Sequence, residues 1–342
     1  MKRNKLLLLT VLFLSGLFSS CTKGELVVYG SCEKLQLTAI CAKFEELTGI
    51  DTRCERYSTG EVLEKIRDEN GKPQADVWFG GTTDPYNEAS LLGLLEPYEA
   101  KNASHLIGPE FKDNQNCWHG IYRGILGIFW NKIELEKLGL ESPKDWDDLT
   151  KPEYKGLIAM ANPSTSGTGK LFVNTMVQLK GEEEAMRYFS ELDKNICIYT
   201  KAGSKASKII PTGEAIIGIG FLHDVLFQIV DNKFAHIGMA APESGTSYEI
   251  GATAILKGCK NLKNAKKFIE FALSPECVNL SQENGAYQFL VIDNAAPVKV
   301  AVDAGLDKIK TINYDFEDAK LKGEKYYAEF FDSIVVDDRF EK

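Results

Sequence analysis

Residues 51–81, DTRCERYSTGEVLEKIRDENGKPQADVWFGG, contain two strand patterns separated by one helix pattern. The first strand, 51–58, ends at Ser58, and Glu61 follows three residues later, which is the capping-box pattern of a helix N-terminus. The second strand, 75–81, is apolar and ends in two glycines. A strand, a helix and a strand in this order predict parallel strands covered by helices.

The same alternation continues on both sides of this segment. Upstream, residues 25–30 (ELVVYG) predict a strand, and residues 33–49 have the apolar spacing of a helix. Two alternating series predict two α/β lobes, each a sheet flanked by helices, and a single large sheet is the alternative. The strands of the second series are expected at residues 156–161, 196–199, 215–221 and 236–241.

Three further segments suggest where the lobes begin and end. Residues 117–132, CWHGIYRGILGIFWNK, are rich in glycine and aromatic residues, and are expected to cross from one lobe to the other and back. Residues 248–258 predict another strand, and residues 261–285 predict a helical region. The N-terminal lobe is thus expected to comprise residues 21–120 plus about 248–297, and the C-terminal lobe residues 121–247 plus about 298–342.

The N-terminus has the pattern of an export signal. Residues 1–5 carry three positive charges and no acid, and an apolar run at 6–18 follows. These features predict a secretory signal peptide over residues 1–20, with an apolar run too short for a permanent membrane span. Cys21 comes next and resembles the lipobox cysteine of bacterial lipoproteins, although Phe18 replaces the usual leucine. Lipidation of Cys21 would tether the protein to a membrane; an ordinary cleaved signal is the alternative.

Charge and cysteine spacing exclude several classes of protein. Loss of residues 1–20 would remove Lys2, Arg3 and Lys5 and change the net charge from −9 to −12. This argues against a nucleic-acid binder, because no basic stripe is present to neutralise phosphates. The chain has 8 cysteines, and no two have CxxC spacing, which disfavours zinc and thioredoxin-like sites. An exported protein can form disulfides, but the spacing does not give the pairing.

Polar turns follow the predicted strands. In open α/β sheets, ligands bind beyond the carboxyl ends of the strands, where these turns converge. Each turn alone is more simply explained as helix capping, but their shared position favours a binding site for an anion. The candidate phosphate-binding residues are Ser31, Ser58, Thr59, Gly81, Thr82, Ser164, Thr165, Ser166, Gly167 and Thr168.

The turn NPSTSGTGK, residues 162–170, lacks two requirements of a nucleotide-binding loop. A GxxxxGK[ST] motif would need glycine at Ser164 and a hydroxyl residue at Leu171. Nucleotide hydrolysis is therefore not expected. The helix that begins near Thr168 can still bind a phosphate monoester through its free backbone amides.

His223 and Asp224 form the fifth turn, directly after the apolar strand 215–221. No GxSxG, HExxH or comparable motif accompanies them, so a catalytic role lacks partners. They either contact a ligand or form a buried histidine satisfied by its neighbour. Glu243 and Glu249 lie where the chain would return between the lobes. Carboxylates bind sugar hydroxyls and repel phosphate, so they are expected at the opposite end of a ligand.

Several motifs together resemble the substrate-binding proteins of bacterial ABC importers, and more narrowly their ferric-iron-type branch. The resemblance implies a two-lobed type II periplasmic-binding-protein fold with the ligand in the inter-lobe cleft. It implies a monomeric, lipid-anchored periplasmic or cell-surface protein that serves an ABC permease and its ATPase, without enzymatic activity, metal or cofactor. The motifs are VVYGS, YSTGEVLEKIRDENGKPQADVWFGGTTDPY, PKDWDDLTKPEYKGLIAMANPSTSGTG and GEAIIGIGFLHD.

The ligand class depends on where tyrosines lie. Iron-binding members place two adjacent tyrosines where this chain has residues 221–224, FLHD. The adjacent pair Tyr326 and Tyr327 lies far from that motif, and Fe³⁺ prefers phenolate or carboxylate oxygen. Ferric iron is therefore the alternative ligand, and a phosphonate or thiamine is less favoured.

The motif FLHD, followed by ESGTSYEIG, most resembles the hexose-phosphate-binding members of the branch. The resemblance implies that His223 and Asp224 contact the sugar together with Glu243 or Glu249. It also implies that Ser31, Thr82 and the turn 164–168 hold the phosphate. The expected ligand is a phosphorylated hexose similar to glucose 6-phosphate.

Overall fold

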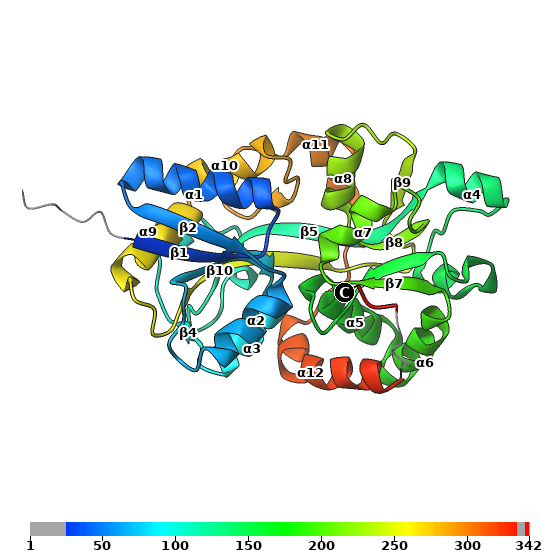
Figure 1. Ribbon diagram of the computed structural model, residues 1–342, viewed down its shortest axis with the longest axis horizontal. Coiled ribbons are helices and arrows are strands. Elements are labelled where there is room, and N and C mark those ends of the chain that lie inside the picture. The colour runs from blue at the N-terminus through cyan, green and yellow to red at the C-terminus, as the bar shows by residue number, and fades with distance from the viewer. Residues whose placement is uncertain (1–24, 334–338, 342) are drawn as a thin grey trace, which may run out of the picture.

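The computed structural model of the chain describes residues 25–333 and 339–341, so the expected signal peptide and Cys21 lie outside the described residues. Figure 1 shows two lobes side by side, with strands running between them. Each lobe contains strands flanked by helices, which confirms the predicted two-lobed α/β fold. The hydrogen-bonded strands follow one path, because β5 belongs to both lobes. In order along this path they are β2 (Asp51–Arg56), β1 (Glu25–Gly30), β3 (Val77–Thr82), β10 (Tyr248–Leu256), β5 (His119–Asn131), β8 (Ile217–Phe221), β6 (Ile158–Ala161) and β7 (Ile196–Thr200).

The N-terminal lobe begins with the strand-helix alternation that the sequence predicts. β1 pairs in parallel with both β2 and β3. Helix α2 begins with the predicted capping box, in which the backbone amide of Ser58 donates to Glu61 Oε2 at 2.9 Å. The elements are β1 (Glu25–Gly30), α1 (Lys34–Thr48), β2 (Asp51–Arg56), α2 (Thr59–Asp68), β3 (Val77–Thr82), α3 (Thr83–Leu91) and β4 (Leu95–Glu96).

Strand β1 shows why this lobe has two apolar layers. Leu26 and Val28 pack with α1 on one face of the sheet, while Val27 and Tyr29 pack with α2 on the other. A strand buried on both faces is apolar throughout, as in LVVY. Because parallel strands end at the same edge, the helices that follow β1, β2 and β3 all begin at that edge, which faces the other lobe.

Strands β5 (His119–Asn131) and β10 (Tyr248–Leu256) connect the lobes. β5 pairs antiparallel with β10 as far as Ile125 and with β8 from Leu126 onwards. The expectation that residues 117–132 cross and return is therefore wrong: they form one strand that crosses once. The chain returns through β10, which pairs with both β5 and β3.

The C-terminal lobe repeats the parallel arrangement, with β6 between β7 and β8. The strand expected at 236–241 forms, but it pairs antiparallel with β5 instead of extending the parallel series. The elements are α4 (Lys132–Leu138), β6 (Ile158–Ala161), α5 (Gly167–Lys180), α6 (Glu182–Asp193), β7 (Ile196–Thr200), α7 (Gly203–Ile209), β8 (Ile217–Phe221), α8 (Leu222–Val230) and β9 (Ile237–Ala240).

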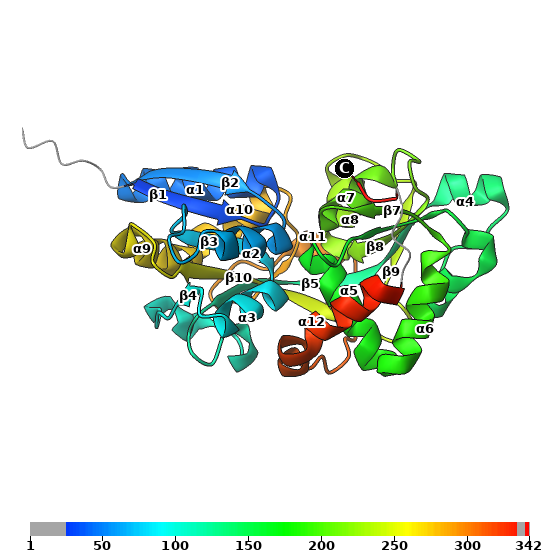
Figure 2. The same cartoon turned by 60° about the horizontal axis from the view of Figure 1, so that its bottom comes forward.

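The last part of the chain covers both lobes. The helical region expected at 261–285 is two helices, and the second begins at Pro275, because proline cannot continue a helix interior. Figure 2 shows α12 (Phe316–Ser333) across α5, and α12 also contacts α3 of the N-terminal lobe. No helix among the described residues is long and apolar enough to cross a membrane. The other elements are α9 (Leu262–Ala272), α10 (Pro275–Glu283), β11 (Phe289–Leu290) and α11 (Lys299–Asp303).

Candidate functional site

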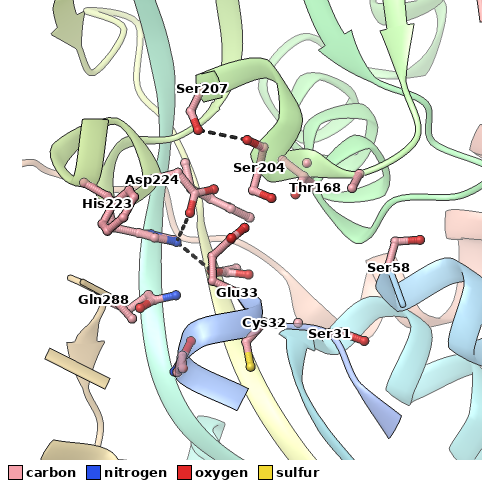
Figure 3. A pocket seen from close by; sticks show the side chains of 18 of the residues that line it. Ser31, Cys32, Glu33, Ser58, Thr168, Ser204, Ser207, His223, Asp224 and Gln288 are labelled. Carbon is pink, nitrogen blue, oxygen red and sulfur yellow. Dashed lines mark hydrogen bonds and ion pairs between the residues drawn. The ribbon is translucent and has the colours of Figure 1, made fainter. Parts of the chain in front are cut away.

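A cavity of about 250 Å³ lies between the lobes, at the carboxyl ends of the parallel strands. Figure 3 shows Ser31 and Ser58 of the N-terminal lobe at one end, and His223 and Asp224 of the C-terminal lobe at the other. The predicted residues that line it are Ser31, Ser58, Thr59, Gly81, Thr82, Ser166, Thr168, His223, Asp224 and Glu249.

Four predicted residues do not line this cavity. Ser164 and Thr165 line a separate surface groove beside α2. Gly167 is buried against Thr82 and does not face the cavity. Its lack of a side chain lets the start of α5 approach Thr82 closely. Glu243 is exposed on the surface. Of the two glutamates that the sequence leaves open, the geometry thus favours Glu249.

Three helix N-termini meet at the end of the cavity near Ser31. Helices α2, α3 and α5 begin at Thr59, Thr83 and Gly167. They approach closely, because a Cβ atom built on Gly167 would lie 1.9 Å from Thr82 Oγ1 and 3.1 Å from Thr59 Oγ1. A helix N-terminus carries about half a positive charge and free amides. This end of the cavity therefore suits an anion.

The hydroxyls at this end differ in whether they can donate to a ligand. Thr82 Oγ1 is buried and has no hydrogen-bond partner. Ser31 Oγ accepts a hydrogen bond from Trp78 Nε1 at 3.1 Å, which leaves its own proton free. Ser58 differs, because its hydroxyl bonds the Thr165 carbonyl oxygen of the other lobe. Of these three hydroxyls of the N-terminal lobe, those of Ser31 and Thr82 are available to donate to a ligand. The hydroxyl of Ser58 instead forms a contact between the two lobes.

The opposite end of the cavity is formed by His223, Asp224 and Glu249. His223 Nε2 lies 3.5 Å from Asp224 Oδ1 and 3.7 Å from Glu249 Oε1. The Phe221 ring stacks on the imidazole with a centroid distance of 5.3 Å. A Cβ atom on Gly124 would lie 2.5 Å from His223 Nδ1 and 2.9 Å from Glu249 Oε1, so only glycine leaves room for this arrangement.

Burial disfavours the charged form of each of these three groups. Loss of water lowers the pKa of His223 to about 3, so the imidazole is neutral at physiological pH. Burial, and after it the charge of Glu33, raise the pKa of Asp224 to about 7, so this carboxyl is only partly ionised at pH 7. Burial and then the charge of Asp224 raise the pKa of Glu249 well above its usual value. Neutral donors and acceptors of this kind suit hydroxyl groups.

Gln36 and Gln288 are cavity residues that sequence reasoning missed. Both are buried, and the Oε1 atom of each has no hydrogen-bond partner. In the part of the chain that the structure describes, six buried side-chain polar atoms lack partners, and four of them belong to residues that line this cavity. Unpaired buried polar atoms are costly, so their concentration here indicates ligand contacts. No local motif marks either glutamine.

Ion pairs join the lobes around the cavity. Lys208 of α7 lies 2.9 Å from Glu33, and Lys201, which follows β7, lies 2.6 Å from Glu61. On another side, Lys170 of α5 lies 3.3 Å from Glu88 of α3. Together with the Ser58 contact to Thr165, these pairs show that the lobes are in contact around the cavity.

The tyrosines are not arranged as a ferric-iron site. Of the tyrosines in residues 25–333, Tyr122 alone lines the cavity, and its hydroxyl accepts a hydrogen bond from the Gly81 amide at 2.8 Å. Tyr326 and Tyr327 are buried in the C-terminal core, where the Tyr327 hydroxyl accepts from Asn174 Nδ2 at 2.7 Å. Among the described residues, no group of three or more His, Cys, Asp or Glu side chains could hold a metal ion.

The chain belongs to the family of bacterial extracellular solute-binding proteins, whose model matches residues 39–312. An uncharacterized protein of Haemophilus influenzae is 40% identical over 327 residues, which is 93% of each chain. The periplasmic binding protein AfuA of Actinobacillus pleuropneumoniae, solved with fructose 6-phosphate bound, is similar with 39% identity and a TM-score of 0.87, covering 92% of this chain and 100% of that one.

A more distant relative is the major ferric iron-binding protein of Neisseria meningitidis, at 25% identity over 74% of this chain and 77% of that protein. These comparisons confirm the ferric-iron-type branch that the sequence resembles. The chain is thus an extracellular or periplasmic solute-binding protein of an ABC importer, with a small-molecule ligand and permease and ATPase partners.

Proposed function

We propose that this protein binds a phosphorylated hexose, similar to glucose 6-phosphate or fructose 6-phosphate, and delivers it to the permease without altering it. The observation that carries the proposal is the contrast between the two ends of the cavity. One end has three helix N-termini and the unpaired Thr82 hydroxyl. The other has the neutral His223 and two buried carboxyls, Asp224 and Glu249, whose pKa values are raised. A phosphorylated sugar has the matching polarity.

The phosphate would be bound mainly by hydroxyls and helix N-termini; the basic residues Arg56 and Lys208 also line the cavity, and the latter is paired with Glu33. Ser31 and Thr82 would donate from the N-terminal lobe, and Ser166 and Thr168 from the start of α5. Hydrogen bonds to a charged group contribute about 1.5–3 kcal/mol each, so a few can dominate the affinity. They must do so against a net charge of −9, which opposes the approach of an anion.

The sugar would be bound by the other end of the cavity. His223 Nδ1 and the Oε1 atoms of Gln36 and Gln288 have no hydrogen-bond partner, and sugar hydroxyls could act as those partners. Asp224 and Glu249 would accept further hydroxyl hydrogen bonds. A bare phosphate would leave all these groups unpaired, so the affinity is expected to depend on the sugar.

Binding would be coupled to closure of the two lobes, because residues of both lobes line one cavity. A ligand stabilises the closed form by the contacts that it makes there and not in the open form. The Ser58 contact to Thr165 and the Lys201–Glu61 pair would form as the lobes meet. The proposed working unit is a monomer, anchored to the membrane by Cys21.

A ligand panel tests the proposal. The mature chain is mixed with glucose 6-phosphate, fructose 6-phosphate, glucose, inorganic phosphate, 2-aminoethylphosphonate and ferric citrate, and its melting temperature is measured. A ligand at 100 times its Kd adds roughly 2.7 kcal/mol of stability, which gives a clear shift. We expect shifts with the sugar phosphates only. A shift with ferric citrate or 2-aminoethylphosphonate alone would contradict the proposal.

The double variant His223→Ala, Asp224→Ala tests the sugar end. We expect its affinity for sugar phosphate to fall at least about 10-fold, since the hydrogen bonds of two side chains to the sugar are lost. His105→Ala is the matched control, because His105 is exposed and pairs with Asp293 away from the cavity. Unchanged affinity in the double variant would remove both residues from the site. Release of inorganic phosphate from the bound ligand would instead indicate an enzyme.

A further inference from the structure

Four cysteines lie together in the apolar core of the N-terminal lobe. Cys32, Cys41 and Cys277 are buried there, and Cys54 packs against them while staying partly exposed. Within this group, the thiols of Cys41 and Cys54 are hydrogen-bonded to each other. The structure thus distinguishes one pair, which the spacing of the cysteines in the sequence does not.

The two cysteines come from neighbouring elements. Cys41 lies in the middle of α1, on the buried face with Leu37 and Phe44. Cys54 lies in β2, the strand at the edge of the sheet, opposite Val28 of β1. The Cys54 thiol also bonds the side chain of Thr38, which is one turn before Cys41 on the same side of α1. The Cys54 thiol therefore faces α1 at the level of Cys41.

The two thiols differ in how easily they ionise. The hydrogen bond from Cys41, with smaller contributions from Thr38 and Lys34, lowers the pKa of Cys54 to about 7. The same hydrogen bond and burial raise the pKa of Cys41 well above its usual value. The thiolate is the reactive form, so Cys54 is the nucleophile of the pair. Its partial exposure gives a reagent access.

We propose that Cys41 and Cys54 are a redox-sensitive pair that closes to a disulfide between α1 and β2 when the protein meets a disulfide-bearing oxidant. The family is extracellular or periplasmic, and these compartments favour disulfides. The pair is distinct from Cys197 in the C-terminal lobe and from Cys117 in another apolar cluster of the N-terminal lobe. Cys259 packs against both clusters of the N-terminal lobe, and neither Cys41 nor Cys54 is hydrogen-bonded to it.

The reaction is a thiol–disulfide exchange in two steps. The Cys54 thiolate attacks one sulfur of the oxidant, a disulfide oxidoreductase or glutathione disulfide, and the other sulfur leaves as a thiolate. Cys41 then loses its proton and attacks Cys54 Sγ, and the second oxidant sulfur leaves. Two electrons pass from the protein thiols to the oxidant, whose disulfide becomes two thiols by taking up the two protons that the protein released.

The cross-link would hold two elements that line the ligand cavity. Gln36 lies in the first turns of α1, and Arg56 ends β2, and both residues line the cavity. The disulfide would close a loop of short length between residues 41 and 54, which restricts the unfolded chain. Oxidation is therefore expected to stabilise the lobe and to fix the position of α1 beside the cavity.

The mature chain is purified under reducing conditions, and one half is oxidised with glutathione disulfide. Free thiols are blocked with iodoacetamide, and non-reduced peptides are mapped by mass spectrometry. We expect a linked peptide that joins Cys41 to Cys54 and is two hydrogens lighter than the separate peptides. We also expect the oxidised protein to melt on the order of 5 °C higher than the reduced protein.

The peptide map of the oxidised wild-type protein tests the proposal without any variant. Alkylation of both Cys41 and Cys54 after oxidation would overturn it, as would a link from Cys54 to Cys32 or from Cys41 to Cys277. Cys54→Ser should abolish the linked peptide and the melting shift, whereas Cys197→Ser should keep both. In the reduced protein, iodoacetamide should label Cys54 before Cys41 at pH 7, and the reverse order would contradict the assigned nucleophile.

Discussion

Replacing Asp224 with asparagine should stabilise the ligand-free protein at pH 8 while it weakens ligand binding. Burial raises the pKa of Asp224 from 3.8 to about 7 in the folded protein. Between these two values the folded state holds a proton that the unfolded state has released. The free energy of unfolding therefore falls as the pH rises from about 4 to about 7, and it stays lower above pH 7.

The magnitude follows from the two pKa values. One pKa unit corresponds to about 1.4 kcal/mol, so the difference between the two pKa values lowers the free energy of unfolding by about 4 kcal/mol at pH 8 and by about 1.5 kcal/mol at pH 5. Asparagine does not ionise, so the variant has no such loss of stability at either pH. Since 15% of the Asp224 side chain stays exposed to the cavity, we expect the stability gain of Asp224→Asn to grow by about 2 kcal/mol between pH 5 and pH 8.

Urea unfolding of ligand-free wild type and Asp224→Asn at pH 5 and pH 8 measures this difference. Trp146, buried in the C-terminal core, reports unfolding of the lobe that carries Asp224. The control is Asp303→Asn, which removes a charge from an exposed position on α11 and should show no such pH effect. Identical pH dependence of wild type and Asp224→Asn would refute the inference that this carboxyl is buried and protonated.

Three further substitutions test separate parts of the site. Gly167→Ala places a Cβ atom 1.9 Å from Thr82 Oγ1, so calorimetry should show at least about 10-fold weaker sugar-phosphate binding; unchanged affinity would contradict the convergence of helix N-termini. Gly124→Ala places a Cβ atom 2.5 Å from His223 Nδ1. It should weaken sugar-phosphate binding more than inorganic-phosphate binding, and equal losses would count against a separate sugar end. Lys208→Gln breaks the exposed Glu33 pair, which is worth at most about 1 kcal/mol, so affinity should fall no more than about fivefold and the loss should disappear in high salt.

Local patterns predicted most of the N-terminal lobe. The capping box of Ser58 and Glu61 and the apolar run of β1 are signals contained in a few neighbouring residues. The parallel pairing of β1, β2 and β3 then follows from the strand-helix alternation. These features need no knowledge of distant parts of the chain.

Long-range pairing was the part that the sequence could not supply. The glycine and aromatic residues of 117–132 suggested a crossing between the lobes, but only the partners of β5 show that the chain crosses there once. Likewise, β9 has the apolar pattern of the parallel strands, yet it pairs antiparallel with β5. Strand partners depend on the whole fold, and an alternation pattern does not specify them.

The candidate site was predicted in part for the same reason. The turns with Ser31, Thr82 and His223 could be found because the carboxyl ends of parallel strands share one edge. Choosing Glu249 over Glu243 required knowing which of them is buried. Gln36 was hidden inside a helix and Gln288 in a loop, and only their unpaired oxygens in the cavity identify them.

The central claim is that one cavity recognises a phosphate and a sugar at the same time. Isothermal titration of the mature chain with fructose 6-phosphate, fructose and inorganic phosphate tests it most directly. The proposal predicts that fructose 6-phosphate binds at least about 100-fold more tightly than either part, because each end of the cavity contributes several hydrogen bonds. Binding of inorganic phosphate as tight as that of fructose 6-phosphate, or no binding of any sugar phosphate, would contradict it.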